Sequence, residues 1–348
     1  MERKIEKYLQ IIRKVHKCNR IYDMHVHPLD VFFNVAEYKE DQHVKGLFSQ
    51  GERHYSKPTL KILKELFMRG DMHSSHNLNS RLIQCFLRKI YLHTGPYVFR
   101  SIFDISEIDK GLLLPVASEN VPIDEQMELV FRMYSGDKRF YLAGSVPNTI
   151  SNENVERFLE KQRDRYSIVA VKIHPNITGI NLGDPEGKER IECVIRACSR
   201  LILPVVIHSG KTHDVSGKSF NFAEIKYFKD INLSSAAPVI LAHGGAYGVP
   251  SSEIRDGIIP VLKELLNMNQ NLCIDISGLT CDAIYILLSN IEIGKILFGS
   301  DALYENPFVM EMRLVSALDS TNLNIEQSLV KIMSENIEDI FGWRSAKQ

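Results

Sequence analysis

The 348-residue sequence has no excess charge of either sign, no dense cysteine framework and no long apolar run. Lysine and arginine number 42 against 43 aspartates and glutamates, which gives a net charge of -1. A chain of this balance has no global field that would recruit nucleic acid or an acidic membrane. We therefore expect no nucleic-acid partner and no membrane partner, and a small-molecule substrate instead.

The cysteines and the first twenty residues argue against a secreted protein. The 6 cysteines include no Cys-x-x-Cys pair and lack the density that staples small secreted domains. They are Cys18, Cys85, Cys193, Cys198, Cys273 and Cys281. Charges interrupt the apolar positions of residues 1–20, unlike the apolar core of a signal peptide, and no later segment approaches a membrane span. We expect reduced, mostly buried thiols in a cytoplasmic protein.

Short apolar runs and helical patterns alternate along the chain. Strands are expected over residues 21–26, 112–116, 140–145, 168–173, 203–207, 239–242, 272–276 and 296–298. Helical patterns are found over 154–165, 189–200, 222–228, 252–266 and 282–288, and again over 308–318 and 325–333 after the last strand. This alternation predicts a parallel sheet with covering helices, and eight strands is the number of an α/β (β/α)8 TIM-type barrel.

The domain organisation that follows has three parts. Residues 1–19 form an N-terminal helix, with Ile5, Leu9, Ile12 and Val15 at helical spacing. Residues 20–348 form the barrel domain. The connection over residues 30–110, after the first strand, is far longer than a normal crossover and reads as a mainly helical insertion. Its place beside His27 suits a lid.

The stretch Asp23-Met24-His25-Val26-His27 is the most informative part of the sequence. Alternate side chains of a strand share one face, so His25 and His27 can hold one metal ion. Later apolar runs end in His208, in His243 and in Asp301. In an open doubly wound sheet such strand ends are spread out, whereas a closed barrel brings all of them to one mouth. Because residues of metal-ligand type end strands from the beginning to the end of the chain, the pattern favours a closed barrel.

Imidazole nitrogens and one carboxylate are the ligand set expected for Zn²⁺ or a similar divalent ion. His25, His27, His208 and Asp301 provide that set. Asp301 would also take a proton from the metal-activated water and pass it to a leaving group. His243 would polarise a carbonyl, orient the water or join a second metal site.

Val171-Lys172-Ile173-His174-Pro175 ends the fourth predicted strand. An inward lysine is costly inside a barrel unless it is paired, deprotonated or modified, so Lys172 is expected to be functional or salt-bridged. It could bridge two metals as a carbamate, hold a substrate carboxylate, or pair with Asp301, and we favour the unmodified amine. His174 is expected at the pocket rim as a substrate-binding residue. Asp275 either faces the site or supports a neighbour.

Taken together, these segments resemble the amidohydrolase superfamily, metal-dependent enzymes built on a (β/α)8 barrel. The matching pieces are Asp23-x-His25-x-His27, Lys172-x-His174-Pro175, His208-Ser209-Gly210, Ala242-His243-Gly244-Gly245 and Phe298-Gly299-Ser300-Asp301. The ending over residues 336–342 looks like the closing helix of the amidohydrolase-2 branch, which includes aminocarboxymuconate-semialdehyde decarboxylase. The resemblance covers residues 20–342 without most of the insertion. It implies His25, His27, His208 and Asp301 as metal ligands and His243 as a catalytic or second-metal residue.

Lys172 departs from the decarboxylase-like mononuclear members, which need no bridging lysine, whereas binuclear hydrolases carry a carbamylated one at the fourth strand. The number of metal ions, one or two, is therefore left open, as is an assembly of two copies. The leading expectation is a metal-dependent hydrolase acting on an amide, ester or lactone of a small polar or carboxylated substrate. The alternative is nonoxidative decarboxylation of an unsaturated or aromatic acid. A TatD-like phosphoesterase and a non-catalytic binding barrel rank lower.

Overall fold

The computed structural model describes residues 2–28, 103–104, 106–118, 122–212, 218–302 and 304–343. Within these ranges, eight strands form one sheet in which each strand pairs in parallel with the next along the chain. The strands are β1 (Tyr22–Val26), β2 (Lys110–Leu113), β3 (Phe140–Ser145), β4 (Ala170–Ile173), β5 (Val205–Gly210), β6 (Val239–Tyr247), β7 (Leu272–Asp275) and β8 (Ile296–Leu297). Each overlaps a predicted strand, and β6 extends five residues beyond its predicted end at residue 242. Most of the insertion over 30–110, with its proposed lid, lies outside the described residues.

The sheet closes where the segment after β8 meets β1. The backbone N–H of Met24 donates to the carbonyl of Phe298 over 3.2 Å, and the N–H of Asp301 donates to the carbonyl of His25 over 2.9 Å. Val26 and Ala302 form a further parallel bridge. Together with the unbroken β1-to-β8 order, these bonds make the predicted parallel barrel.

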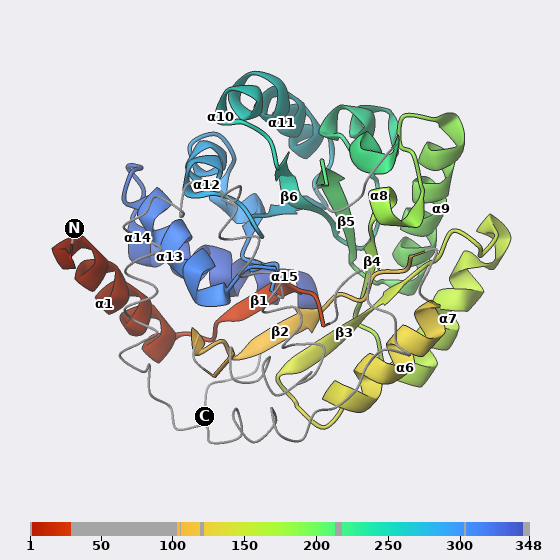
Figure 1. Cartoon of the computed structure of the whole chain (residues 1–348), viewed down its shortest axis with the longest axis horizontal. Coiled ribbons are helices and arrows are strands. Elements are labelled where there is room, and N and C mark those ends of the chain that lie inside the picture. The colour runs from red at the N-terminus through yellow and green to blue at the C-terminus, as the bar shows by residue number, and fades with distance from the viewer. Residues whose placement is uncertain are drawn as a thin grey trace.

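Helices lie along the outside of much of the sheet (Figure 1). They are α1 (Glu2–Cys18), α6 (Ile123–Tyr134), α7 (Val155–Tyr166), α8 (Pro175–Thr178), α9 (Pro185–Leu201), α10 (Ser251–Glu253), α11 (Ile259–Met268), α12 (Cys281–Leu288), α13 (Pro307–Leu318), α14 (Ile325–Val330) and α15 (Asn336–Phe341). The N-terminal helix α1 packs against α13 and α14, and it buries Ile5, Ile12 and Val15 as its spacing predicts. Gly342 ends α15 with a left-handed φ of 65°, a conformation that suits glycine.

Two helical segments differ from the sequence-based expectation. The prediction of a helix over residues 222–228 is wrong, because the chain there forms only a short 3₁₀ helix at Ile225–Asp230. Helix α6 was not predicted, although Ile123, Met127, Val130 and Tyr134 follow a helical spacing and are all buried. The expected helices over 252–266 and 325–333 are both interrupted by a π-helical turn, at Ile254–Ile258 and Lys331–Glu335.

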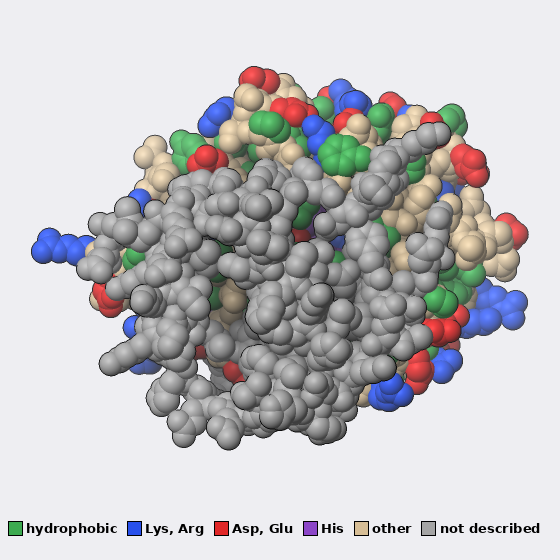
Figure 2. All heavy atoms as spheres, in the orientation of Figure 1, with side chains coloured by type: hydrophobic (Ala, Val, Ile, Leu, Met, Phe, Trp, Pro, Cys, Tyr) green, Lys and Arg blue, Asp and Glu red, His purple; other side chains and the backbone are tan. Residues whose placement is uncertain are grey.

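The barrel wall is apolar over most of its length. Val205, Val206 and Ile207 in β5 are fully buried, and so are Val239, Ile240 and Leu241 in β6, because the interior and the helices cover both faces of a parallel strand. Cys18 is exposed, and the other four described cysteines are buried free thiols. None of the helices in the described ranges is both long and apolar enough to cross a membrane. Figure 2 shows side chains of both charge signs interspersed over the described part of one face.

Candidate metal centre

The predicted site residues gather at the carboxyl ends of the strands, inside the mouth of the barrel. His25 lies in β1 with His27 just beyond it, Lys172 lies in β4, His208 in β5 and His243 in β6, and Asp301 follows β8. Together with His174, they are between 0% and 6% exposed. Residues from opposite ends of the sequence therefore share one buried space, as the barrel prediction requires.

Three ligand-type atoms from the first and last strand segments form a compact triangle. The Nε2 atoms of His25 and His27 are 3.3 Å apart, and the Oδ1 atom of Asp301 lies 3.5 Å and 3.2 Å from them. Neighbouring ligand atoms of a tetrahedral site with metal–nitrogen bonds of 2.0–2.1 Å lie about 3.3 Å apart. The triangle therefore has the size that one small divalent cation requires.

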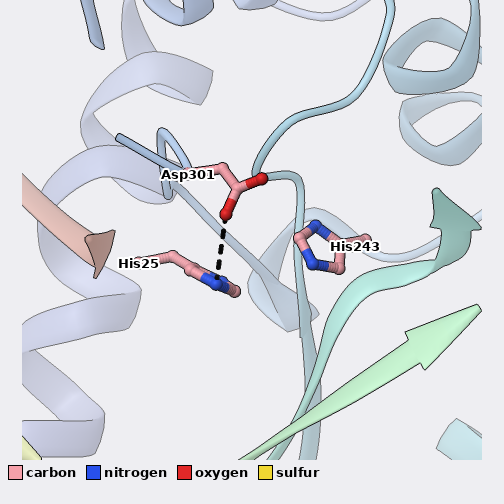
Figure 3. Close-up of side chains that lie close together, drawn as sticks. All are labelled: His25, His243 and Asp301. Carbon is pink, nitrogen blue, oxygen red and sulfur yellow. Dashed lines mark ion pairs between the residues drawn. The ribbon is translucent and has the colours of Figure 1, made fainter. Parts of the chain in front are cut away.

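His243 reaches the same space from β6. It offers a ring nitrogen within 4.8 Å of ligand atoms of both His25 and Asp301, and Figure 3 shows the three side chains turned toward one another. The rings of His25 and His243 lie 5.0 Å apart.

Each of these three imidazoles is anchored through its Nδ1 atom. In His25, Nδ1 lies 2.9 Å from Oδ2 of Asp275, and in His27 it lies 3.1 Å from the carbonyl of Leu114. In His243, Nδ1 lies 2.7 Å from the carbonyl of Ser277. A carbonyl can only accept, so the proton of His27 and of His243 sits on Nδ1 and leaves the Nε2 lone pair for a metal. The Nε2 atom of His25 is one corner of the triangle that it forms with His27 and Asp301, so it faces the same space.

His208 and His174 form a stacked pair at the edge of this cluster. Their ring centroids are 3.8 Å apart with an interplanar angle of 11°, and the ring of His208 lies 4.9 Å from that of His243. Nε2 of His208 is buried and has no hydrogen-bond partner among the described residues. A buried nitrogen without a partner is costly, and a cation would supply the missing interaction.

Lys172 is fully buried at the base of the cluster. Its Nζ atom lies 3.2 Å from Nε2 of His25. Burial lowers the pKa of this amine to about 8. Among the described residues, no ion pair joins Lys172 to Asp301 within 4.0 Å, so the lysine contacts the histidine side of the centre.

Burial keeps the imidazoles neutral. It lowers the pKa of His27 to about 3 and that of His243 to about 4, and it lowers the pKa values of His25, His174 and His208 as well. Neutral imidazole is the form that binds a metal. Burial also raises the pKa of Asp301 above its usual value. A cation beside that carboxylate would offset the cost of its charge.

The backbone is strained at two of these residues. His243 has a φ of 60° and Asp301 a φ of 66°. A left-handed conformation costs roughly 1–3 kcal/mol for a residue other than glycine and is concentrated at functional sites. His243 lies within β6 and Asp301 follows β8, and both side chains line the same cavity.

A cavity opens over the cluster. Besides four histidines and Asp301, it is lined by Ile177, Thr212, Tyr247 and Tyr304. The ring of Tyr304 packs edge-on against His27 at 5.4 Å, and the ring of Tyr247 lies 4.8 Å from that of His243. Sequence reasoning did not find these four residues, because each comes from a short helix, a loop or a strand end without a ligand-type motif.

The structure also answers the question that the sequence left open for Asp275. It is fully buried and contacts His25, so it supports a neighbouring side chain. Although burial acts to raise its pKa, interactions with His25 and His243 hold the pKa of Asp275 well below its usual range. Ser277, two residues further, shares this environment. The sequence signal for this pair was its two-residue spacing, which places Asp275 and Ser277 on the same face of an extended segment.

No protein-family model matches the chain, and a search of curated proteins finds no match either. Solved structures do resemble it. An uncharacterised TIM-barrel protein from Bordetella bronchiseptica is 13% identical, with 93% of this chain and 98% of that chain covered and a TM-score of 0.57. A 5-carboxyvanillate decarboxylase from Novosphingobium aromaticivorans, solved with manganese and 4-hydroxy-3-methoxy-5-nitrobenzoic acid, is 12% identical, with 93% and 96% covered and a TM-score of 0.54.

A third solved structure, described as amidohydrolase II, is 15% identical, with 92% of this chain and 99% of that chain covered and a TM-score of 0.50. At this level of identity the likeness concerns the fold. The solved structures that share this fold thus include one described as amidohydrolase II and several decarboxylases, in agreement with the resemblance carried by the motifs of this chain. The predicted (β/α)8 barrel is confirmed.

Proposed function

We propose that this protein is a metal-dependent hydrolase that cleaves an amide, ester or lactone bond of a small molecule. The observation that carries the proposal is the triangle of His25 Nε2, His27 Nε2 and Asp301 Oδ1, with edges of 3.2–3.5 Å. Its neutral imidazoles and its single carboxylate fit Zn²⁺ or a similar divalent ion such as manganese. His25, His27, His208 and Asp301 would hold the ion, and His243 would face it or join a second one.

A bound divalent ion would supply Lewis acidity and lower the pKa of a coordinated water. The protein's own part is proton movement and orientation. Asp301 lines the cavity and has a raised pKa, so it is suited to take a proton and return it to a leaving group. His243, also in the cavity wall, would orient the scissile carbonyl. Burial of the whole cluster keeps bulk water away from these transfers.

Lys172 and His174 have separate roles in this proposal. His174 lines the cavity and would contact the substrate, as expected from its place beyond β4. Lys172 lies behind His25 as an unmodified amine, where its charge influences the centre. Carbamylation of Lys172 would instead create a bridge for two ions, so the metal count of the purified protein separates the two forms.

The described part of the cavity wall contains no lysine and no arginine. A substrate carboxylate would therefore find its cationic partner in the divalent ion itself, and the same ion would polarise the carbonyl of an ester, lactone or amide. Decarboxylation of an aromatic or unsaturated acid is the second candidate, because decarboxylases are frequent among the solved structures that share this fold.

The proposal is tested with purified protein stripped of metal and then reloaded with Zn²⁺ or Mn²⁺. Panels of esters, lactones, amides and aromatic acids are followed by product analysis, with carbon dioxide release as a separate readout. We expect hydrolysis that depends on metal and is lost in His25→Ala and Asp301→Asn. Undiminished hydrolysis in both variants would reject the role of the centre, and carbon dioxide release without water consumption would replace hydrolysis by decarboxylation.

A further inference from the structure

Two fully buried residues at the end of β7, Asp275 and Ser277, lie between the histidines of β1 and β6. Oδ2 of Asp275 is 2.9 Å from Nδ1 of His25. Oγ of Ser277 is 2.9 Å from the same Nδ1 and 3.0 Å from Nδ1 of His243.

The hydrogen-bond donors to Asp275 are numerous. Its Oδ1 accepts from the backbone N–H of His243 over 3.0 Å, from the N–H of Ser277 over 3.0 Å, and from the hydroxyl of Ser277. Its Oδ2 is left for Nδ1 of His25. An ionised carboxylate only accepts hydrogen bonds, so this contact requires a proton on Nδ1 of His25.

The same reasoning applies to His243. The hydroxyl proton of Ser277 is donated to Asp275, so Oγ of Ser277 can only accept from the two imidazoles. The carbonyl of Ser277 also accepts from Nδ1 of His243. Both histidines are thereby held with the proton on Nδ1 and the lone pair on Nε2, toward the space that Asp301 shares.

We propose that Asp275, assisted by Ser277, is a positioning residue that sets the tautomer of His25 and His243 and so makes the centre competent to bind a divalent ion. The inference deepens the proposed function and rests on its metal centre. It assigns to one carboxylate at the end of β7 the control of a proposed ligand on β1, while Ser277, which that carboxylate orients, holds the imidazole on β6.

A purely structural role is the competing explanation, because Asp275 also fixes the strained backbone of His243 through its N–H. The variant Asp275→Asn separates the two roles. Its side-chain oxygen can still accept the three bonds made to Oδ1, whereas its NH₂ group faces Nδ1 of His25 as a donor. His25 must then accept on Nδ1 and carry its proton on Nε2, which removes its metal-binding lone pair.

The first test measures Mn²⁺ binding to the metal-stripped full chain by the electron paramagnetic resonance signal of free Mn²⁺. Loss of an orienting partner of a metal-bound histidine typically weakens binding by about 10–100-fold, and we expect a loss of that size in Asp275→Asn. Glu311→Gln is the matched control, since it neutralises another fully buried carboxylate and should bind like the wild type. A folded Asp275→Asn protein with wild-type affinity would overturn the inference.

The second test needs neither a variant nor a metal. Nitrogen-15 spectra of histidine-labelled wild-type protein report which ring nitrogen carries the proton. We expect the Nδ1–H form for His25 and His243, and an Nε2–H form in His25 would overturn the inference even if Asp275→Asn fails to fold. Absence of divalent-ion binding by the wild type would instead reject the proposed function, while the tautomers would still decide the part played by Asp275.

Discussion

The backbone N–H of Asp301 donates a 2.9 Å hydrogen bond to the carbonyl oxygen of His25. The same two residues place Oδ1 and Nε2 3.5 Å apart, so the bond that closes the barrel also brings the last proposed ligand to the first. Asp23 strengthens this junction, because its Oδ1 accepts from the N–H groups of His25 and Ser300. The contacts that close the barrel therefore also assemble the candidate metal centre.

Gly299 allows the close approach on which this junction depends. A Cβ atom at this position would lie 2.5 Å from Cβ of His25, far inside van der Waals contact. We expect Gly299→Ala to displace His25 and to weaken Zn²⁺ or Mn²⁺ binding by about tenfold or more, with a loss of about 1–3 kcal/mol in stability. Metal titration and thermal unfolding check this. Gly136→Ala, where a Cβ would meet nothing within 4 Å, is the control, and equal behaviour of the two variants would contradict the prediction.

Asp301→Asn should separate stability from metal binding. Burial raises the pKa of Asp301, so its charge costs free energy in the metal-free fold, and asparagine removes that charge while tolerating the same left-handed backbone. We expect a higher melting temperature in the presence of a chelator, by about 2 °C or more for each kcal/mol relieved. Metal should then stabilise the wild type but not the variant. A lower melting temperature of the chelated variant would contradict this reasoning.

His208 and His174 should respond differently to truncation although their rings are stacked. Each ring buries one nitrogen that has no hydrogen-bond partner among the described residues, Nε2 in His208 and Nδ1 in His174, but the ring of His208 also lies 4.9 Å from that of His243. His208→Ala should therefore lower metal affinity by about 100-fold while leaving the metal-free protein folded. His174→Ala should keep most of the affinity and raise KM, as expected of a substrate contact. Isothermal titration with the metal and steady-state kinetics provide the two measurements. The reverse pattern would exchange the roles of the two residues.

Glu311 provides a pH test away from the centre. This α13 carboxylate is fully buried, its oxygens accept no hydrogen bond among the described residues, and its nearest cationic candidate is Nε2 of His16 at 3.5 Å. Burial raises the pKa of Glu311 well above its usual value, and the charges of Asp23 and Glu107 raise it further. A raised folded-state pKa means that stability is present below the unfolded value of 4.5 and is lost as pH rises through the folded value.

Glu311→Gln should therefore raise the melting temperature at pH 8, and the gain should shrink as the pH falls toward 5. The difference between variant and wild type, recorded across this range in one buffer series, is the relevant measurement. A gain that is independent of pH would show that packing, and not the charge of Glu311, is responsible.

The sequence predicted much of the fold because strand periodicity is local. Continuous apolar runs such as the one around Val206 identify strands that are buried on both faces, and those strands lie where they were expected. Two helical segments gave the errors. The segment around Ile225 has apolar residues but forms only a 3₁₀ turn, and α6 was overlooked despite its spacing.

His25, His27 and Asp301 could be named from the sequence because a strand end followed by a ligand-type residue is a local pattern. The residues that contact and orient these three side chains could not be predicted from the sequence. Asp275 meets His25 across 250 positions of sequence, and Tyr304 reaches His27 only because the chain closes after β8. Such contacts depend on the register and closure of the barrel, which no short segment encodes.

The amino-acid sequence by itself determined which residues are of metal-ligand type and that they lie in or just after parallel strands. The tertiary structure alone decided how close they come, which nitrogen of each imidazole is anchored, and which carboxylate supports rather than binds. The physical reason is that side-chain type and strand period are properties of neighbouring residues. Distances of 3.2–3.5 Å between β1 and the end of β8 arise only when hydrogen bonds close the sheet.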